Sequence, residues 1–228
     1  MIQKTFGCCR FVYNQTLAYR KNLYETEKKA MSKLDCNNYV TRELKRDYEW
    51  LKEVDKFALT NAVYSMDNAY QRFFKSRFGY PKFRSKHDHK QSYTTCITGT
   101  NIKVLFDQNK IQLPKLKLVK ARLSRPFYGQ IKNATVSQTP SGKYFVSITV
   151  ETEHEPLPST GSMIGIDLGI KDLLITSNGE KFDNKRIIKQ YEDKLTRAQR
   201  RLSRKVKGSN NYNKQRIKVA RIHEKIHN

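Results

Sequence analysis

The sequence predicts an α+β fold made of several modules. Three observations support this: the hydrophobic period changes from helical to alternating after the first third, a proline- and serine-rich segment then interrupts the pattern, and cations concentrate in the last fifth. We expect a helical bundle over 1–86, a small antiparallel β-barrel or sheet over 87–153, a linker over 154–162, and over 163–228 a few strands followed by a basic helical hairpin.

The 228 residues carry a net charge of +24, from 45 basic and 21 acidic side chains. Such a charge repels itself unless a polyanion neutralises it, so nucleic acid is the leading partner and a membrane surface the alternative. No apolar run approaches the roughly 18–20 residues of a spanning helix, and no signal-peptide segment follows Met1. We expect a cytoplasmic, nucleoid-associated protein with no membrane insertion.

The four cysteines are Cys8, Cys9, Cys36 and Cys96, and no two of them form a Cys-x-x-Cys pair. This spacing excludes a zinc ribbon within the chain, so zinc is not expected. We expect reduced thiols, as in a cytosolic protein.

Helical periodicity dominates residues 1–86. A polar break is expected at Asp35–Asn38, before a short helix that reaches about residue 48. Asp55 fits the N-cap of a longer helix, which the FGYP stretch at 78–81 should end. The buried stripe of the first helix is predicted to contain Phe6, Cys9 or Arg10, Tyr13, Leu17 and Tyr24. That of the longer helix is predicted to contain Leu59, Ala62, Val63, Met66, Ala69, Tyr70 and Phe73.

Short alternating or β-branched segments follow, separated by the turns DQNK and TPSGK. They predict antiparallel strands at 92–98, 101–106, 110–113, 131–139 and 143–152. Beyond the linker, two strands are expected within 163–170 and 172–177, with a third within 179–183.

Two long helices should then pack along one apolar seam. Gly208 fits the end of the first helix and Ser209 the N-cap of the second. The seam is predicted to contain Ile188, Tyr191, Leu195, Ala198 and Leu202, facing Tyr212, Val219, Ile222 and Ile226.

Asp167 stands inside the apolar run GIDLGIKD, residues 165–172. The flanking residues indicate a strand largely buried on both faces, where an unpaired carboxylate would cost several kcal/mol. Gly165 and Gly169 leave room beside it for a hydrated metal ion or a phosphodiester. A metal ligand, a hydrogen-bonded structural acid and a relic of a site that is no longer complete all fit this pattern.

Residues 184–228 hold 15 Lys and Arg but 3 acids, a net charge of +12. This density favours contact with the backbone of RNA or DNA, without base specificity, over a merely solvated helix face. The candidate contacts are Arg197, Arg200, Arg201, Arg204, Lys205 and Lys207.

The loop FFKSRFGYPKFRSKHDHK, residues 73–90, alternates aromatic and basic residues. Its aromatic rings could stack on bases while its basic side chains neutralise phosphates. The aromatic rings could equally fill a junction between modules. The candidate binding residues are Tyr80, Lys82 and Arg84, with Phe78, Phe83, Lys75 and Arg77 in the same pattern.

Two histidine patterns suggest metal sites. His223 and His227 fit the H-E-x-x-H signature of zinc proteases, but their helix is strongly basic and lacks apolar surroundings. His87-Asp88-His89 fits a surface turn better than a metal site.

The segment GIDLGIKDLLITSNGEKF, followed by YEDKLTRAQRRLSRKVKGSNNYNKQRIKVARIHEKI, resembles the first RuvC segment of the transposon-encoded TnpB family. The upstream stretches GCCRFVYNQTLAYR, WLKEVDKFALTNAVYSMDNAYQRFF, GYPKFRSK and KIQLPKLKLVK resemble it too. The resemblance implies a transposon-associated, RNA-guided DNA endonuclease that uses Mg²⁺, guide RNA and double-stranded DNA. It also implies a wedge-like barrel over 87–153 and the first part of an RNase H-like (RuvC) domain over 163–228.

By that resemblance Asp167 is the first of three acidic Mg²⁺ ligands. Lys56, Phe57, Thr60 and Thr98 lie where the family contacts a short motif that flanks the DNA target, and Thr60 is shorter than the amide-type residue expected there. The second and third acids and a Cys-x-x-Cys zinc finger would follow the hairpin, and a barrel strand would precede Met1.

We therefore expect a fragment truncated at both ends, with no nuclease activity from this chain alone, since one acid cannot organise two Mg²⁺ ions. A non-catalytic RNA- or DNA-binding module and an inactive, decayed remnant are the alternatives.

Overall fold

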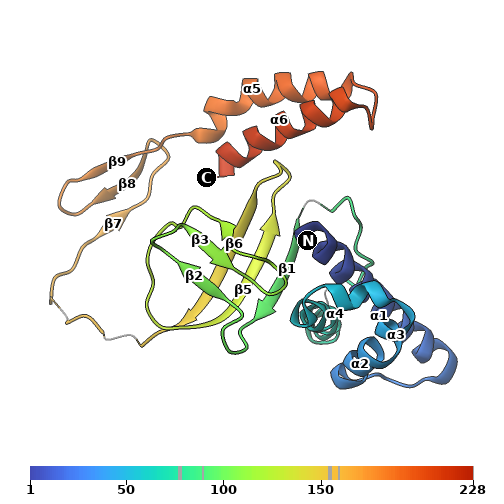
Figure 1. Ribbon diagram of the computed structural model, residues 1–228. Coiled ribbons are helices and arrows are strands. Elements are labelled where there is room, and N and C mark those ends of the chain that lie inside the picture. The colour runs from blue at the N-terminus through green and yellow to red at the C-terminus, as the bar shows by residue number, and fades with distance from the viewer. Residues whose placement is uncertain (77–78, 89, 154–155, 159, 228) are drawn as a thin grey trace. The chain divides into compact units, whose positions relative to one another are not determined.

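A computed structural model describes residues 1–76, 79–88, 90–153, 156–158 and 160–227 (Figure 1). The chain forms two compact units, one of Met1–Thr139 with Lys143–Glu153 and one of Pro140–Gly142 with His154–Asn228. It is a mixed α+β structure of N-terminal helices, three small antiparallel sheets and a C-terminal helix pair. No helix in the described ranges is long and apolar enough to cross a membrane.

The first unit begins with helices. They are α1 (Ile2–Glu27), α2 (Lys33–Tyr39), a π-helical turn (Val40–Leu44), α3 (Lys45–Asp47), a 3₁₀ turn (Glu49–Glu53) and α4 (Lys56–Ser76). The predicted break at Asp35–Asn38 is wrong, because those residues lie inside α2. The chain breaks instead at Lys28, which has a left-handed backbone, and Ser32 and Asp35 then start α2 with a reciprocal capping box.

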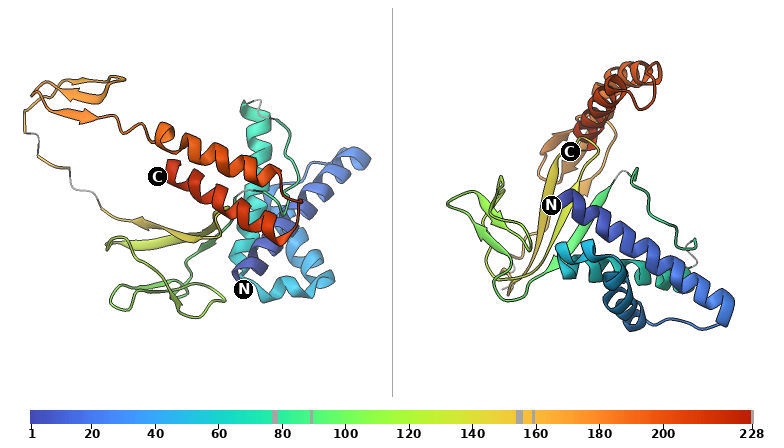
Figure 2. Two further views of the ribbon diagram at one scale, coloured as in Figure 1. Left: turned by 90° about the horizontal axis from the view of Figure 1, so that it is seen from above. Right: turned by 45° about the vertical axis from the view of Figure 1, so that its right-hand side comes forward.

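Helices α1 and α4 lie side by side in both views of Figure 2, and their apolar faces join one core. The predicted stripe of α1 is confirmed at Phe6, Tyr13 and Leu17, which are buried. It is wrong at Tyr24, which is 58% exposed near the far end of the helix. The predicted face of α4 is buried at Leu59, Ala62, Val63, Met66 and Tyr70, while Ala69 and Phe73 are half-buried.

Two antiparallel sheets complete this unit, and the five predicted strands are all present in them. The first has the order β1-β5-β6, from β1 (Gln91–Cys96), β5 (Gln130–Gln138) and β6 (Tyr144–Glu151). The second has the order β2-β3-β4, from β2 (Lys103–Leu105), β3 (Lys110–Gln112) and the unpredicted β4 (Val119–Lys120). The pairings between described strands leave two separate sheets, with β1 at an edge, so a closed barrel is not shown.

The second unit contains a small sheet and a helical hairpin. The sheet has the order β7-β8-β9, from β7 (Ile166–Asp167), β8 (Asp172–Thr176) and β9 (Lys181–Asp183). Helices α5 (Ile187–Ser203) and α6 (Asn210–His227) form the predicted hairpin. Ser209 accepts a hydrogen bond from the Tyr212 amide at 3.1 Å, which confirms the N-cap, and Gly208 has φ +88°.

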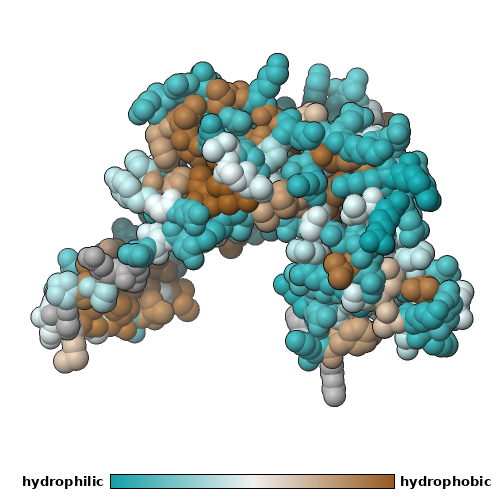
Figure 3. Space-filling model, turned by 60° about the horizontal axis from the view of Figure 1, so that its bottom comes forward, coloured by the Kyte–Doolittle hydropathy of each residue, from teal (hydrophilic) through white to brown (hydrophobic). Residues whose placement is uncertain are grey.

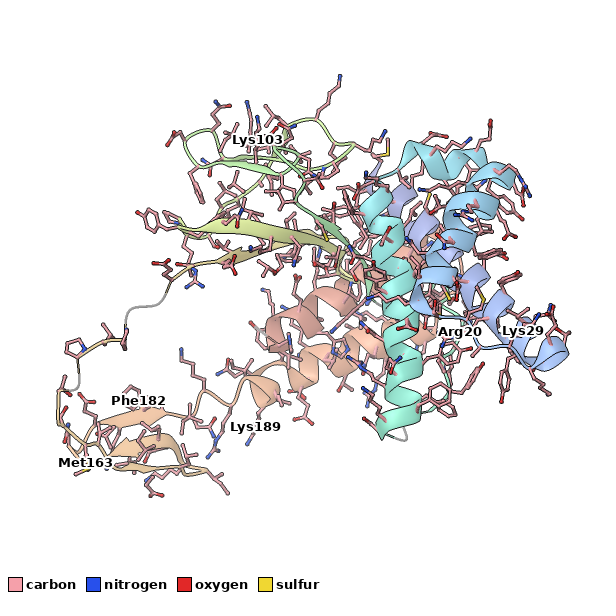
Figure 4. All side chains as sticks on the ribbon, turned by 90° about the horizontal axis from the view of Figure 1, so that it is seen from below. Arg20, Lys29, Lys103, Met163, Phe182 and Lys189 are labelled. Carbon is pink, nitrogen blue, oxygen red and sulfur yellow. The ribbon has the colours of Figure 1, made fainter. Side chains whose placement is uncertain are left out.

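The predicted two-sided burial of the strand around Asp167 is wrong. Leu168 is 74% exposed and Ile170 is 85% exposed, and Asp167 is exposed as well. The physical reason is that burial of both faces needs a packed layer on each side, and the core clusters of the described residues include no residue of this small sheet. Figure 3 accordingly shows hydrophobic surface gathered on the lobe that carries this sheet, and Figure 4 marks Met163 and Phe182 there.

Candidate nucleic-acid interface

A groove lined by cations runs along one face of the hairpin. Helix α5 contributes Lys194, Arg197 and Arg201, which are spaced i, i+3 and i+7 and therefore share one face. Helix α6 contributes a second row with the same spacing, Lys218, Arg221 and Lys225. Two rows of positive charge thus face each other across the groove.

The floor of this groove explains why the rows come close together. Ala198, Val219 and Ile222 form the buried core of the hairpin, and the small Ala198 side chain allows close helix packing. Gln215 donates a hydrogen bond across the seam to the Ala198 carbonyl at 2.9 Å. The seam prediction holds at Tyr191, Leu195, Leu202 and Ile226, which pack against that core, whereas Ile188 is 70% exposed.

The cations of the groove remain available to a ligand. Within the part of the chain that the structure describes, none of the six forms an ion pair with a carboxylate. Of the residues predicted from the sequence, Arg197 and Arg201 line the groove. Arg200, Arg204, Lys205 and Lys207 are exposed on α5 and the following turn but do not line it.

A second groove lies in the first unit, at the start of α4. Lys56 and Phe57 at the helix start and Thr98 after β1 line it together, although they are distant in sequence. Thr60 is one turn further along α4, where its hydroxyl donates to the Lys56 carbonyl at 3.2 Å. The Lys56 ammonium lies 5.0 Å from the centre of the Phe57 ring, which is half-buried.

Other polar residues line the same groove and were not identified from the sequence. They are Lys45, Lys52, Asn101 and Lys115. Burial and, second, repulsion from Lys56 lower the pKa of Lys45, as expected where like charges crowd together. An anion in this groove would relieve that repulsion. The basic stretch KIQLPKLKLVK was a signal for Lys115, but nothing in the local sequence pointed to Asn101.

The aromatic-basic loop is anchored at two of its predicted binding residues. The Tyr80 hydroxyl forms a 2.7 Å hydrogen bond with that of Tyr70 on α4. The Arg84 guanidinium lies 3.9 Å from the centre of the Tyr13 ring and donates to the Ser65 hydroxyl at 2.5 Å. These contacts favour the junction-filling interpretation for Tyr80 and Arg84.

The rest of that loop is less engaged. Lys82 and Phe83 are exposed. Arg77, Phe78 and His89 lie outside the described residues, as do residues 154, 155 and 159 of the predicted linker. Lys75 and Lys82 are therefore the cations of the predicted pattern whose charge faces solvent in the described part.

Asp167 pairs in register with Ile175 of β8, and its side chain is exposed. A Cβ added at Gly169 would meet the Asp172 carbonyl oxygen at 3.0 Å, so the tight turn itself accounts for this glycine. The described residues contain no group of three or more His, Cys, Asp or Glu side chains that could hold a metal ion, His87, His223 and His227 included. One carboxylate does not fit the several that a two-ion site requires.

Comparisons with known proteins identify related sequences. Residues 146–228 match a family described as "Probable transposase" (OrfB_IS605), and residues 1–29 match its "Helix-turn-helix domain". The chain is 34% identical to "Putative RNA-guided DNA endonuclease InsQ" of Escherichia coli (strain K12) over 97% of its length and 54% of that protein. It is also 34% identical to a "Putative RNA-guided DNA endonuclease" of Streptomyces pristinaespiralis, over 99% of its length and 56% of that protein.

A shorter similarity links the chain to "Virulence protein VsdF" of Salmonella dublin, with 35% identity over 36% of this chain and 77% of that protein. The chain spans about half the length of the two endonuclease relatives.

Proposed function

The chain belongs to the TnpB/OrfB (IS605) family of transposases, and from that premise we propose that it supplies nucleic-acid-binding surfaces of an RNA-guided DNA endonuclease. The observation that carries the proposal is the hairpin groove, where six cations in two rows, without a carboxylate partner among the described residues, flank an apolar floor. Such a surface neutralises a phosphate backbone but cannot distinguish bases, which suits a protein whose sequence specificity comes from a guide RNA.

The two grooves have different roles in this proposal. The hairpin groove binds the backbone of the guide RNA or of its duplex with DNA. The groove at the start of α4 contacts the DNA that flanks the target, through Lys56, Phe57 and Thr98, with Thr60 beside them. An aromatic ring beside lysines and two polar side chains can contact both base edges and phosphates.

We also propose that residues 163–228 form the first part of an RNase H-like (RuvC) domain and that residues 87–153 form a wedge-like barrel. The antiparallel order β7-β8-β9 followed by α5 and α6 supports the first part of an RNase H-like domain. The sheets of β1–β6 would form the wedge-like module. A cytoplasmic, nucleoid-associated location follows from DNA as the target.

Mg²⁺ would be the cofactor of the whole endonuclease, and Asp167 would provide one of its carboxylate ligands. The described residues alone do not fit a two-ion site, so we derive no cleavage step from them. We expect the 228-residue chain to bind nucleic acid without cutting it. Guide-directed, Mg²⁺-dependent cleavage by this chain that is lost in Asp167→Asn would overturn that expectation.

The binding test compares two triple variants with equal charge loss. Lys194→Gln/Arg197→Gln/Arg201→Gln removes the α5 row of the groove, whereas Arg200→Gln/Arg204→Gln/Lys205→Gln removes three cations beside it. We expect the first variant to weaken binding to a structured RNA by at least about tenfold. The slope of log affinity against log salt concentration should also become less negative by roughly 2, because each lost phosphate contact accounts for about 0.7–0.9 of that slope. The second should have a smaller effect on both.

Equal losses in the two variants would show that overall charge, and not the groove, binds the RNA. Retained affinity in the groove variant would contradict the proposal. Circular dichroism of both variants checks that the hairpin remains helical.

A further inference from the structure

Asp55 is a buried acid in the groove at the start of α4. One wall of this groove is the start of the helix, with Lys56 and Phe57, and the other is the loop after β1, with Thr98 and Asn101. Asp55 is 6% exposed, and its carboxylate accepts hydrogen bonds from the Phe57 amide at 3.3 Å, the Ala58 amide at 3.1 Å and the Thr95 hydroxyl at 2.6 Å. The first two bonds cap α4, as the sequence predicts. The third connects the start of this helix to β1, 40 residues further along the chain.

A second bond supports the same connection. β1 is the edge strand of its sheet, so its outer backbone groups need a partner. Asn61, one and a half turns into α4, donates its side-chain amide to the Thr94 carbonyl at 2.9 Å. Helix α4 is thereby fixed along the open edge of β1 at two points, of which the Asp55–Thr95 bond is nearer to the groove.

Hydrogen bonds in the loop after β1 fix the position of Thr98 relative to that strand. Asn101 accepts a hydrogen bond from the Thr98 amide at 2.8 Å and donates one to the Cys96 carbonyl at 3.1 Å. Gly99, with φ +59°, makes the turn between them. The position of Thr98 therefore follows from that of β1, just as the positions of Lys56 and Phe57 follow from the capped end of α4.

We infer that Asp55 and Thr95 are positioning residues that set the spacing between the two walls of this groove and thereby its selection of a flanking DNA sequence. Both side chains are buried, so they act through Lys56, Phe57 and Thr98 and need not touch DNA. The inference rests on the proposed function of the groove and assigns to it a determinant of specificity. Base recognition needs fixed donor and acceptor positions, whereas phosphate attraction tolerates movement. Loss of the Asp55–Thr95 bond should consequently reduce sequence preference more than total affinity.

The test uses the full 228-residue chain and a library of DNA duplexes with one randomised segment. Thr95→Val keeps the side-chain shape and removes only the hydroxyl that bonds Asp55. We expect the enrichment of the preferred sequence to fall by about tenfold, the scale of one hydrogen bond to a charged group, while affinity for random duplex stays within about twofold. Thr95→Ser should restore the preference, because it restores the hydroxyl.

Thr94→Val is the matched control. Its hydroxyl bonds Thr135 of β5 at 2.8 Å, so this variant also loses one hydrogen bond of β1 but leaves the bond to α4 intact. We expect it to keep the wild-type preference. An equal fall in both variants would reduce the effect to general weakening of the sheet and would overturn the inference.

The remaining outcomes separate the inference from the proposed function. A wild-type chain with no preference would overturn both. A preference that Phe57→Ala abolishes and Thr95→Val retains would overturn the inference alone. If Thr95→Val fails to fold at the assay temperature, Asp55→Asn provides the second test, since asparagine still caps α4 but removes the charge to which the Thr95 hydroxyl donates. An unchanged preference in that variant overturns the inference.

Discussion

The helix-and-sheet unit and the hairpin α5–α6 differ in how they use charged side chains. In the first unit, Asp55 and Asp67 are buried and each has a fixed partner, with Arg20 bonded to Asp67 at 2.9 Å (Figure 4 labels Arg20). In the hairpin, the cations of the groove are unpaired within the described chain, and the buried core consists of Ala198, Val219 and Ile222. Charge organises structure in the first region and is left available for a ligand in the second.

This difference has a thermodynamic consequence. A truncation in the large core of the first unit leaves a cavity that its surroundings cannot fill, whereas the small hairpin core of Ala198, Val219 and Ile222 can collapse around the lost atoms. The self-repulsion of the hairpin also grows as salt falls, so a bound polyanion should stabilise it. Three pairs of substitutions and a pH series can break or sharpen the comparison.

The largest expected effect is on packing in the first unit. Leu59 on α4 is 1% exposed, and Leu59→Ala should lower the free energy of unfolding by about 3 kcal/mol. Ile222→Ala in the hairpin is the control, with an expected loss of about 1–2 kcal/mol because its site is small and can collapse. Urea denaturation followed by circular dichroism should show them affecting separate transitions. Equal losses would contradict the comparison.

The buried ion pair comes next. The side chains of Arg20 and Asp67 are 14% and 12% exposed, and the Arg20 guanidinium also lies 4.2 Å from the centre of the Tyr70 ring. Asp67→Asn leaves Arg20 without its counter-charge and should cost about 2 kcal/mol. Glu53→Gln, which breaks the exposed pair with Lys4, should cost less than about 0.5 kcal/mol. A thermal scan that shows similar shifts for both would remove the distinction between them.

High pH should weaken the first unit selectively. Burial raises the pKa of the Cys36 thiol to about 11, and also raises those of Cys8 and Cys9. Because the folded state keeps these protons while the unfolded thiols lose theirs near pH 9, stability is full below pH 9 and declines as pH rises toward 11, with a contribution from Cys36 on the order of 2 kcal/mol. Urea midpoints measured across this window should fall less steeply in Cys36→Ala. The hairpin contains no cysteine, so its helicity provides an internal reference.

Asp167→Asn should have the smallest effect on stability. Asp167 is exposed, so this substitution should change the free energy of unfolding by less than about 0.5 kcal/mol. Asp55→Ala, in contrast, should cost about 2 kcal/mol through the lost cap and the unpaired Thr95 hydroxyl. Differential scanning fluorimetry of both variants is sufficient. A large loss in Asp167→Asn would mean that this acid is structural.

The hydrophobic periodicity of the sequence predicted where the helices and strands lie better than it predicted which of their residues are buried. It located α1, α4, α5 and α6 and the strands of the first unit, because the pattern of apolar residues within one segment is local information. It failed at Asp35–Asn38, where the capping box of Ser32 and Asp35 favours a helix despite the polar composition. It failed again at the strand of Asp167, since two-sided burial requires neighbouring layers that no single segment reveals.

In the candidate sites, too, features that depend on nearby residues were predictable, whereas contacts between distant segments were not. The sequence alone determined the cation density of the hairpin, the spacing of its two rows and the capping role of Asp55, because each depends on residues within a few helical turns. Only the tertiary structure decided that Arg84 is held by Tyr13 and Ser65, that Lys45 and Asn101 join Lys56 and Thr98 in one groove, and that Asp55 reaches Thr95. These contacts connect residues tens of positions apart, and their distances depend on how the segments pack rather than on the pattern within any one of them.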